Sequence, residues 1–348
     1  MNKRLQQFIA HFDQQKIDAY LVTNTVNITY LTHFPASESW LLVFPTKIFY
    51  ITDARYTLEA RRGLKDGINV VEYTKSMVPK VFELMGEMKA GRLGFDDRHM
   101  SLAQFKNFEK NRPNGIDLVA IADETEKLRQ VKEKNEVDLI RKALKLNLKA
   151  YQYLKSVVKP GVSEKQVLEK LESYVKKAGA GFSFPPIIAS GPNSCYPHAR
   201  VSDRKIKNNE SVLIDMGMDI QGYKSDLTRM FFLGKIPPLV KEVNDFVAES
   251  QERAIRKIKP GIPAADVDFE ARNFLEQHRL AKYFGHSLGH GVGLEIHESP
   301  RIAQHNSTIL KEGMVFTVEP AVYLPNKFGI RIEDMVLVTA EGCEVLSR

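Results

Sequence analysis

The sequence predicts an α+β protein of two domains, the second of which is a duplicated structure. Three observations lead to this prediction. The first 121 of the 348 residues alternate short β-rich runs with helical patterns, residues 122–134 are polar and charge-dense, and the tetrapeptide at 159–162 (Lys-Pro-Gly-Val) returns one hundred residues later at 259–262 (Lys-Pro-Gly-Ile). Because a chain of this length exceeds the size at which one hydrophobic core usually stops growing, two domains are expected.

The first part reads as a small α/β domain. Its β-rich runs are bounded by turn residues, and its helical runs repeat apolar positions every three to four residues. The predicted strands are 19–22, 40–43, 48–51, 69–71, 92–94 and 118–121, and the predicted helices are 55–62, 78–89 and 102–110. The polar stretch that follows suits a linker, so we place the domain boundary near Glu124 and expect domains at 1–124 and 125–348.

The second part opens with a long helix and then shows the repeat. Apolar positions from Val137 recur at helical spacing. Each Lys-Pro-Gly tetrapeptide ends one helical pattern and opens another, and the first of these new helices has Ser163 as N-cap, Gln166 three residues later and a stop at Gly179. An extended apolar region with acidic residues follows each helix pair, which indicates two half-domains whose sheets face a shared centre.

Composition excludes several classes of protein. With 43% hydrophobic and 27% charged residues and no apolar run of membrane-spanning length, the chain reads as a soluble globular protein, and residues 1–12 form an amphipathic pattern unlike a signal peptide. The two cysteines, Cys195 and Cys343, cannot build a disulfide framework. The net charge of +7 is scattered among acids, so we expect a cytoplasmic protein with neither nucleic acid nor membrane as a partner.

Two pairs of acidic residues lie in β-like runs. Asp215 ends the run 211–214 and Asp226 opens the run 227–232, a hairpin pattern that can place both carboxylates on one face. Glu319 and Glu333 follow these aspartates by 104 and 107 residues, close to the spacing of the repeat. Facing carboxylates repel each other unless they are protonated or hold a cation, so each half of the duplication is expected to supply one pair to a cation site.

A segment rich in histidine and glycine lies between the pairs, at 285–298, and contains His286, His290 and His297. It lacks the spacing of a phosphate-binding loop, which argues against a nucleotide site. Four carboxylates and one imidazole form an oxygen-rich ligand set with a charge of about −4, enough for two divalent ions. Two such ions, roughly 3.5 to 4 Å apart, bridge a water, lower its pKa and polarise a carbonyl, so hydrolysis is the expected chemistry.

These motifs resemble, in order and spacing, those of pita-bread-fold metallopeptidases of the Xaa-Pro dipeptidase (prolidase) and aminopeptidase P group. The resemblance covers essentially the whole chain and implies a duplicated, pseudo-twofold pita-bread domain after a smaller creatinase-like α/β domain. It implies that Asp226 and Glu333 bridge the two metal ions. The full implied ligand set is Asp215, Asp226, His290, Glu319 and Glu333.

The resemblance also implies roles for residues around the metals. His198, which ends the segment 192–198, would contact substrate or the developing oxyanion, and His297 would hold the peptide carbonyl or the proline end. Glu319 would also carry a proton to the leaving proline nitrogen. His286 would line a proline pocket, and Arg331 would support the carboxylates. The expected activity is hydrolysis of the Xaa-Pro bond at the N-terminus of dipeptides or short peptides by a hydroxide that two metal ions activate.

Several further expectations follow from the resemblance. Proline-containing peptides are the expected partners, with a homodimer as the assembly, and the N-terminal domain would support dimerisation and restrict access to small substrates. Trp40 is a candidate to reach a partner's site, although packing within its own domain is the alternative. The segment 52–56 (Thr-Asp-Ala-Arg-Tyr) resembles the aminopeptidase P side of the group and is expected to build a strand-to-helix turn. Manganese is the expected metal, and the same ligands accept cobalt, zinc or iron.

Two rival functions stay open at this point. A creatinase-like hydrolase would share the fold without using a metal, and a silent pita-bread module would bind peptides without cleaving them. All five expected ligands are present, which argues against both, because a metal-free site has no reason to confine four acids. The sequence does not separate a strict dipeptidase from an aminopeptidase.

Overall fold

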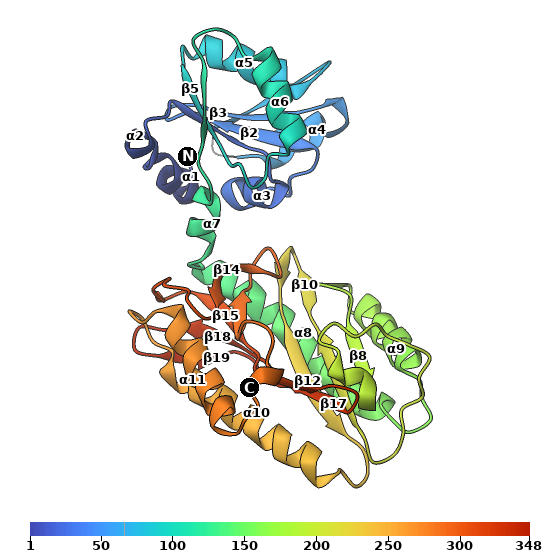
Figure 1. The fold of residues 1–348 in the computed structure, drawn as a ribbon. Coiled ribbons are helices and arrows are strands. Elements are labelled where there is room, and N and C mark those ends of the chain that lie inside the picture. Colours follow the sequence, from blue (N-terminus) through green and yellow to red (C-terminus); the bar gives the residue numbers. More distant parts are fainter. Residues whose placement is uncertain (66) are drawn as a thin grey trace. The chain divides into compact units, whose positions relative to one another are not determined.

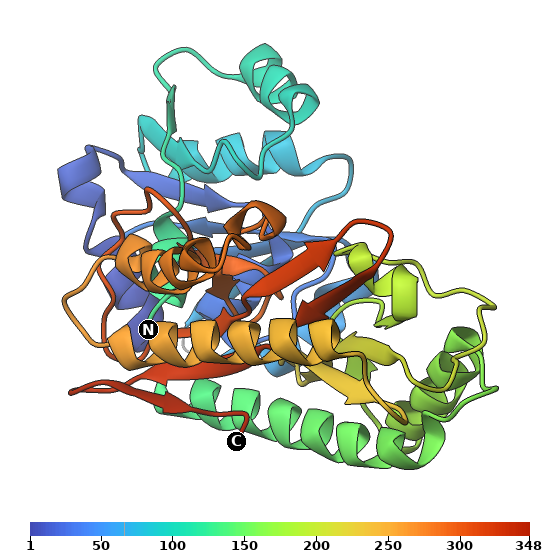
Figure 2. The ribbon, with the colours of Figure 1, turned by 60° about the horizontal axis from the view of Figure 1, so that its bottom comes forward.

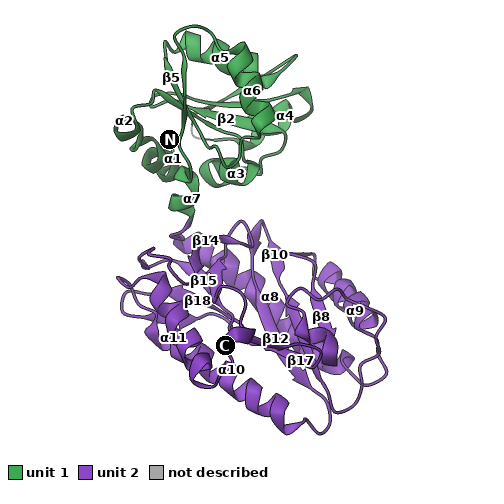
Figure 3. Ribbon diagram, in the orientation of Figure 1, with its two compact units in different colours: residues 1–129 green, residues 130–348 purple. Residues whose placement is uncertain are grey.

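The chain, described here from a computed structural model, divides into two compact units at residues 1–129 and 130–348 (Figure 3). The structure describes residues 1–65 and 67–348. Both units mix helices and strands, and the smaller unit precedes the larger, so the predicted α+β class is confirmed (Figure 1). None of the helices in the described residues has the length and apolar character needed to cross a bilayer.

Unit 1 is a six-stranded mixed sheet with helices on both faces. The strand order is β4-β3-β2-β1-β5-β6, in which β1 pairs antiparallel with β2 and parallel with β5. In chain order its elements are α1 (Lys3–Ile9), α2 (Phe12–Gln15), β1 (Ala19–Val22), α3 (Thr25–Thr32), β2 (Ser39–Val43), β3 (Ile48–Thr52), α4 (Ala54–Gly63), β4 (Ile68–Glu72), α5 (Met77–Glu87), β5 (Arg92–Phe95), α6 (Leu102–Asn111), β6 (Asp117–Ala120) and α7 (Glu124–Arg129).

Side-chain alternation along β1 explains the two covered faces of this sheet. Leu21 belongs to the apolar cluster that also contains residues of α5 and α6. Tyr20, on the opposite face, packs edge-on against Phe8 of α1 at 5.1 Å between ring centroids. Trp40 of β2 packs against Phe108 of α6 at 5.6 Å, so its ring has a packing partner within unit 1.

Two segments of unit 1 bear on the sequence predictions. Asp53 is the N-cap of α4 and accepts hydrogen bonds from the backbone and side chain of Arg55, which makes the segment 52–56 the strand-to-helix turn expected. The stretch 122–134, expected to be a linker, instead contains helix α7. Its first turn carries Glu124 and Glu126 and its last turn Arg129, which suits the helix dipole, and buried contacts with α1 and α3 stabilise it.

The described residues of unit 2 form a three-stranded sheet, a five-stranded sheet, two smaller sheets (β11-β10-β7 and β16-β17) and the helices that cover them. The order β12-β9-β8 forms the three-stranded sheet, and the order β13-β15-β18 forms the centre of the five-stranded sheet. In chain order the elements of unit 2 are α8 (Lys134–Val157), α9 (Glu164–Lys177), β7 (Gly181–Phe182), β8 (Ile187–Ser190), η1 (Gly191–Cys195), β9 (Ser211–Met216), β10 (Met218–Ile220), β11 (Tyr223–Lys224), β12 (Leu227–Phe232), α10 (Pro238–Lys257), α11 (Ala264–Gln277), η2 (Ala281–Tyr283), β13 (Gly289–Gly291), β14 (Glu298–Ile302), β15 (Val315–Val318), β16 (Ala321–Leu324), β17 (Phe328–Arg331), β18 (Asp334–Val338) and β19 (Cys343–Val345).

Hydrogen bonds at the two Lys-Pro-Gly turns show the duplication directly. The amide of Gly161 donates to the carbonyl of Ile206 at 2.8 Å, and the amide of Gly261 donates to that of Leu310 at 2.9 Å. Ser163 and Gln166 form the expected capping box, and α9 ends just before Gly179, whose φ of +71° favours glycine. The two halves therefore repeat the same junction, which confirms the predicted duplicated domain.

The long helices α8 and α10 occupy matching places in the two halves. Helix α8 contacts β10, β11 and β12, whereas α10 contacts β15, β16 and β17. Figures 1 and 2 show α8 in green and α10 in gold, each lying against the strands of its own half. Each helix buries one apolar face in the core of that half, so the strands pack against a long helix.

Candidate metal centre

The strands of unit 2 bring the four predicted acids to one place. Asp215 lies in β9 opposite Thr228 of β12, and Asp226 immediately precedes β12. Glu319 directly follows β15, and Glu333 lies between β17 and β18. These acids therefore stand at or near strand ends, where each half delivers one pair to the centre of the unit.

The structure places His290 among the acids. Its Nε2 atom lies 3.4 Å from Oε1 of Glu319 and 3.7 Å from Oδ2 of Asp226. One donor atom from each of Asp226, His290 and Glu333 lies within 4.8 Å of the others. Asp215 joins the group through Arg331, whose Nη2 atom lies 2.5 Å from Oδ2 of Asp215. All five predicted ligands thus lie around one centre.

The hydrogen bonding of His290 leaves Nε2 available as a ligand atom. Its Nδ1 atom faces the carbonyl oxygen of Gly291 at 3.1 Å, and because a carbonyl only accepts, Nδ1 carries the hydrogen. Burial lowers the pKa of His290 to about 4, so the ring is neutral near pH 7. The Nε2 lone pair then points at the acids, the usual arrangement of a metal-binding histidine.

The negative charge of the four acids exceeds the positive charge of the side chains around them. Burial, followed by the charges of Glu333 and Asp215, raises the pKa of Asp226, and burial followed by the charge of Glu319 raises the pKa of Glu333. Burial also raises the pKa of Glu319 to about 8. Among the described side chains, Arg331 is the cation whose charge opposes these shifts at all three carboxyls.

Two carboxylate oxygens at the centre provide a test of whether cations fit. Oδ1 of Asp215 and Oδ1 of Asp226 are buried and have no hydrogen-bond partner within the described residues. Buried polar atoms are normally paired, and four carboxylates against one guanidinium leave a surplus of negative charge. The set of oxygen donors and one imidazole nitrogen therefore fits divalent cations, with the unpaired oxygens as coordination positions.

His286 and His297 lie beside this centre. The rings of His290 and His297 meet edge-to-face with 4.4 Å between centroids, and burial lowers the pKa of His297. Nδ1 of His286 donates to the carbonyl of Ser287 at 2.8 Å, and burial lowers its pKa to about 4. Its Nε2 atom lies 3.3 Å from the hydroxyl of Tyr323. Both histidines therefore present neutral rings to the site.

His198 occupies an exposed loop that buried groups hold in place. Arg331 donates to the carbonyl oxygen of Pro197, the residue before His198, at 3.2 Å. Glu164 of α9, which is fully buried, accepts hydrogen bonds from backbone and hydroxyl groups at both ends of this loop, Ser190 and Ser202. A cavity of about 480 Å³ lies beside the loop and is lined by Tyr196, His198, Arg200 and neighbouring residues. The loop thus combines an accessible imidazole with an anchored backbone.

Sequence reasoning missed several residues that shape the centre. Thr228 donates to Glu333 at 2.7 Å and accepts from Arg331 at 3.0 Å, and Tyr323 accepts from Arg331 at 2.5 Å. Thr228 lies in the run 227–232, which Asp226 opens, so its position gave a partial signal. Tyr323 gave none, because its contacts join residues from different strands.

Gly289 and Gly291 of the histidine-rich segment let neighbouring strands pack closely. A Cβ atom on Gly289 would lie 1.9 Å from the carbonyl oxygen of Thr317, and one on Gly291 would lie 2.4 Å from that of Ser299. Both glycines therefore allow β13, which carries His290, to lie tightly between β14 and β15.

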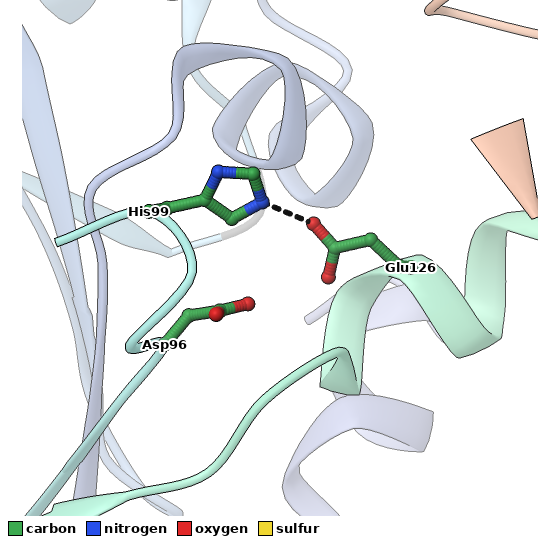
Figure 4. Close-up of side chains that lie close together, drawn as sticks. All are labelled: Asp96, His99 and Glu126. Atoms are coloured by element: carbon green, nitrogen blue, oxygen red, sulfur yellow. Dashed lines mark hydrogen bonds and ion pairs between the residues drawn. The ribbon is translucent and has the colours of Figure 1, made fainter. Parts of the chain in front are cut away.

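Unit 1 contains a second group of potential ligands that the sequence did not single out, Asp96, His99 and Glu126 (Figure 4). His99 Nε2 lies 2.8 Å from Oε1 of Glu126, and its Nδ1 atom lies 3.1 Å from Nδ2 of Asn24. Both oxygens of Asp96 accept backbone hydrogen bonds, from Arg98 and Asp123. Since both nitrogens of His99 and both oxygens of Asp96 have partners, we assign this group to hydrogen bonding within unit 1.

Comparison with known proteins adds the family. Residues 138–340 match metallopeptidase family M24, and residues 4–131 match the creatinase/prolidase N-terminal domain. The Xaa-Pro dipeptidase of Pyrococcus furiosus is 35% identical over 351 residues, covering 100% of this chain and 98% of that protein.

Solved structures agree over the whole length. A structure of the Xaa-Pro dipeptidase from Bacillus anthracis superposes with a TM-score of 0.95 at 33% identity, covering 99% of this chain and 97% of that one. The X-Pro aminopeptidase from Thermotoga maritima gives a TM-score of 0.88 at 33% identity, with 96% of both chains covered. The pita-bread fold expected from the motifs is thereby confirmed, and the chain belongs to metallopeptidase family M24, with a creatinase/prolidase-type N-terminal domain before its catalytic domain.

Proposed function

We propose that this protein is a metal-dependent exopeptidase that hydrolyses the Xaa-Pro bond at the N-terminus of dipeptides or short peptides. The observation that carries the proposal is the convergence of three buried carboxylates, the partly buried Glu319 and the Nε2 atom of His290 on one centre, with two carboxylate oxygens unpaired among the described residues. The relatives named Xaa-Pro dipeptidase and X-Pro aminopeptidase support the substrate class.

The proposed ligands are Asp215, Asp226, His290, Glu319 and Glu333. Asp226 and Glu333, the most enclosed of the acids, would each be shared between two metal ions. When bound, two divalent ions, manganese in our proposal, would lower the pKa of a water molecule and polarise the scissile carbonyl. Arg331 keeps Asp215 oriented through its 2.5 Å contact, so the ligand geometry does not depend on the ions alone.

Glu319 is proposed to carry a proton from the attacking water to the leaving proline nitrogen. Its side chain is 15% exposed, which suits a group that meets the substrate, whereas Glu333 is buried. A carboxylate can accept a proton and later release it, which suits transfer in both directions. The rings of His297 and His198 are proposed to donate hydrogen bonds to the substrate carbonyl as negative charge develops.

The preference for proline follows from the shape and hydrogen bonding of the substrate. An Xaa-Pro bond has no N–H, so an enzyme that recognises an extended backbone through that donor loses a contact. His286, held by Ser287 and Tyr323, is proposed to form one wall of the pocket that receives the ring. Selection by shape and by contacts to the carbonyl then replaces the missing hydrogen bond.

We assign to the N-terminal domain, predicted as residues 1–124, the roles of dimerisation and of restricting access to small peptides. Support comes from the match of residues 4–131 to the domain that precedes the catalytic domain in creatinases and prolidases. The homodimer, the reach of Trp40 toward a partner and the cytoplasmic location are predictions from the sequence alone.

The decisive experiment is a hydrolysis assay on metal-stripped protein. We expect release of the N-terminal residue from Ala-Pro or from a longer Ala-Pro peptide after addition of Mn²⁺, loss of release with a chelator, and no cleavage of Ala-Ala. Comparing the dipeptide with the longer peptide separates a dipeptidase from an aminopeptidase. Cleavage that persists without metal would favour the creatinase-like alternative, and binding without cleavage under any divalent ion would favour a silent module.

A further inference from the structure

Each half of unit 2 places one buried side-chain amide directly behind its pair of acids. Asn147 of α8 is fully buried, and Gln251 of α10 is 2% exposed. The two residues are 104 positions apart, the same separation as Asp215 and Glu319. They are therefore counterparts in the duplication, one from each long helix.

Both amides donate hydrogen bonds beside the acids. Nδ2 of Asn147 donates to the carbonyl of Met216, the residue after Asp215, at 2.7 Å, and lies 3.3 Å from Oγ of Ser225, the residue before Asp226. One amide group of α8 thus joins the two chain segments that carry the first acid pair.

The second half repeats this arrangement. Nε2 of Gln251 donates to the carbonyl of Val318 at 2.8 Å and to that of Ile332 at 3.1 Å. Val318 and Ile332 are the residues before Glu319 and Glu333. A single amide of α10 therefore ties together the backbone segments of both glutamates.

We propose that Asn147 and Gln251 are positioning residues that set the separation of the carboxylates within each pair, and so the affinity of the centre for metal ions. The proposal rests on the ligand assignment made above. Four acids that repel one another tend to spread the strands that carry them, and an amide that spans two segments opposes this movement from a rigid helix. Metal–ligand distances tolerate deviations of only about 0.2 Å, so a small shift of either segment is enough to weaken binding.

The test is a titration of metal-free full-length protein with Co²⁺, followed by visible absorbance, for Gln251→Met and Asn147→Leu. These substitutions keep the side-chain volume and remove the donors. We expect the Kd for Co²⁺ to rise by about 10- to 100-fold, as when groups that orient ligands are removed, and the absorbance spectrum of the bound ion to change. With Co²⁺ saturating, kcat for Ala-Pro should fall while KM changes little, because the pocket histidines are untouched.

Ser250→Ala is the matched control. Ser250 is a buried neighbour of Gln251 on the same helix, but its hydroxyl donates to the carbonyl of Ala271 in α11. We expect this variant to lower the melting temperature and to retain the wild-type Kd for Co²⁺. If Ser250→Ala weakens Co²⁺ binding as much as Gln251→Met does, the effect belongs to the helix in general and the proposal is overturned.

A folded Gln251→Met or Asn147→Leu protein with wild-type Kd and spectrum would also overturn it. If Gln251→Met does not fold, Gln251→Asn keeps an amide that is one methylene shorter, and wild-type Co²⁺ affinity in that variant would count equally against the proposal. The titration does not depend on catalysis. Wild-type protein that binds two Co²⁺ ions and cleaves no Xaa-Pro peptide would contradict the proposed function, while the variants would still judge this inference.

Discussion

The two groups of histidine and acids, one in each unit, contain the same kinds of ligand in different surroundings. In unit 1 Oδ1 of Asn24 accepts from the amides of Val26 and Asn27, so its Nδ2 group donates to Nδ1 of His99, and Nε2 of His99 donates to Glu126. In unit 2 the carbonyl of Gly291 faces Nδ1 of His290, and the Nε2 lone pair points at the acids.

The hydrogen bonding of the carboxylate oxygens also differs between the two groups. Backbone amides satisfy both oxygens of Asp96, and Oε1 of Glu126 accepts from Asn27 and His99, which leaves Oε2 of Glu126 as the buried oxygen without a partner among the described residues. In unit 2, Asp215 and Asp226 each keep one such oxygen within the described chain. The comparison teaches that ligand types alone do not make a metal site. The neighbouring atoms decide which ring nitrogen is free and whether the carboxylates have other partners.

The strongest test of this contrast removes a shared acid from the centre of unit 2. We expect Asp226→Asn and Glu333→Gln each to lower kcat/KM by about a thousandfold or more and to lose bound metal, because a ligand shared by two ions serves both. Inductively coupled plasma mass spectrometry and the Ala-Pro assay measure the two effects. The matched control, Asp96→Asn, should keep metal content and activity; an equal loss of metal there would erase the distinction between the groups.

A smaller effect is expected from a histidine beside the metals. His297→Ala should lower kcat by about a hundredfold, since it removes a donor to the developing charge, and should leave metal content unchanged because His297 is not one of the five ligands. Steady-state kinetics with metal analysis on the same samples tests both parts. Normal turnover in this variant would show that its assigned role is wrong.

The acid surplus also predicts a pH dependence for the metal-free protein. Burial raises the pKa of Glu319 from 4.5 to about 8 and raises those of Asp226 and Glu333. In the folded state these carboxyls hold protons that the unfolded chain releases near pH 3.8 for Asp226 and pH 4.5 for the glutamates, so stability should fall as pH rises from about 4 to about 8. Metal binding requires the deprotonated carboxylates, so the melting temperature gained on adding Mn²⁺ should grow across this range.

Thermal melts at pH 5, 6, 7 and 8, with and without Mn²⁺, measure this trend. We expect a decline of several degrees in the metal-free samples and a shallower profile with metal. A metal-free protein whose melting temperature rises steadily over this interval would contradict the raised pKa values of these carboxyls.

Local signals in the sequence account for much of the fold. Ser163 and Gln166 predicted a helix start because a capping box uses neighbouring residues, and the hairpin pattern of the runs 211–214 and 227–232 predicted paired strands. The Lys-Pro-Gly turns predicted the duplication because each turn is a short local motif that can be recognised twice in the sequence. Helix α7 gave no such signal, and helix α3 had only its N-cap Asn24; contacts with other elements of unit 1 stabilise both short helices.

In the candidate centre, too, local patterns could be predicted and contacts between distant residues could not. The two acid pairs and the histidine-rich segment could be found from spacing, and the structure brings Asp215, Asp226, His290, Glu319 and Glu333 together. Thr228, Tyr323 and Gln251, which hold these ligands in place, could not be found from spacing. Their partners are distant in sequence or lie on different strands. Nothing in the local sequence around Gln251 distinguishes it from an ordinary polar residue of an amphipathic helix.

The smallest expected effect concerns the histidine of unit 1. His99→Gln should leave metal content and the hydrolysis of Ala-Pro unchanged, because the ring is held by hydrogen bonds to Asn24 and Glu126. Losing this arrangement should cost about 1 kcal/mol, which corresponds to a fall in melting temperature of a few degrees. Metal analysis and thermal melts on the same preparation measure both quantities. A wild-type protein with three bound ions, one of which His99→Gln loses, would show that Asp96, His99 and Glu126 hold a metal and that the contrast between the two units is wrong.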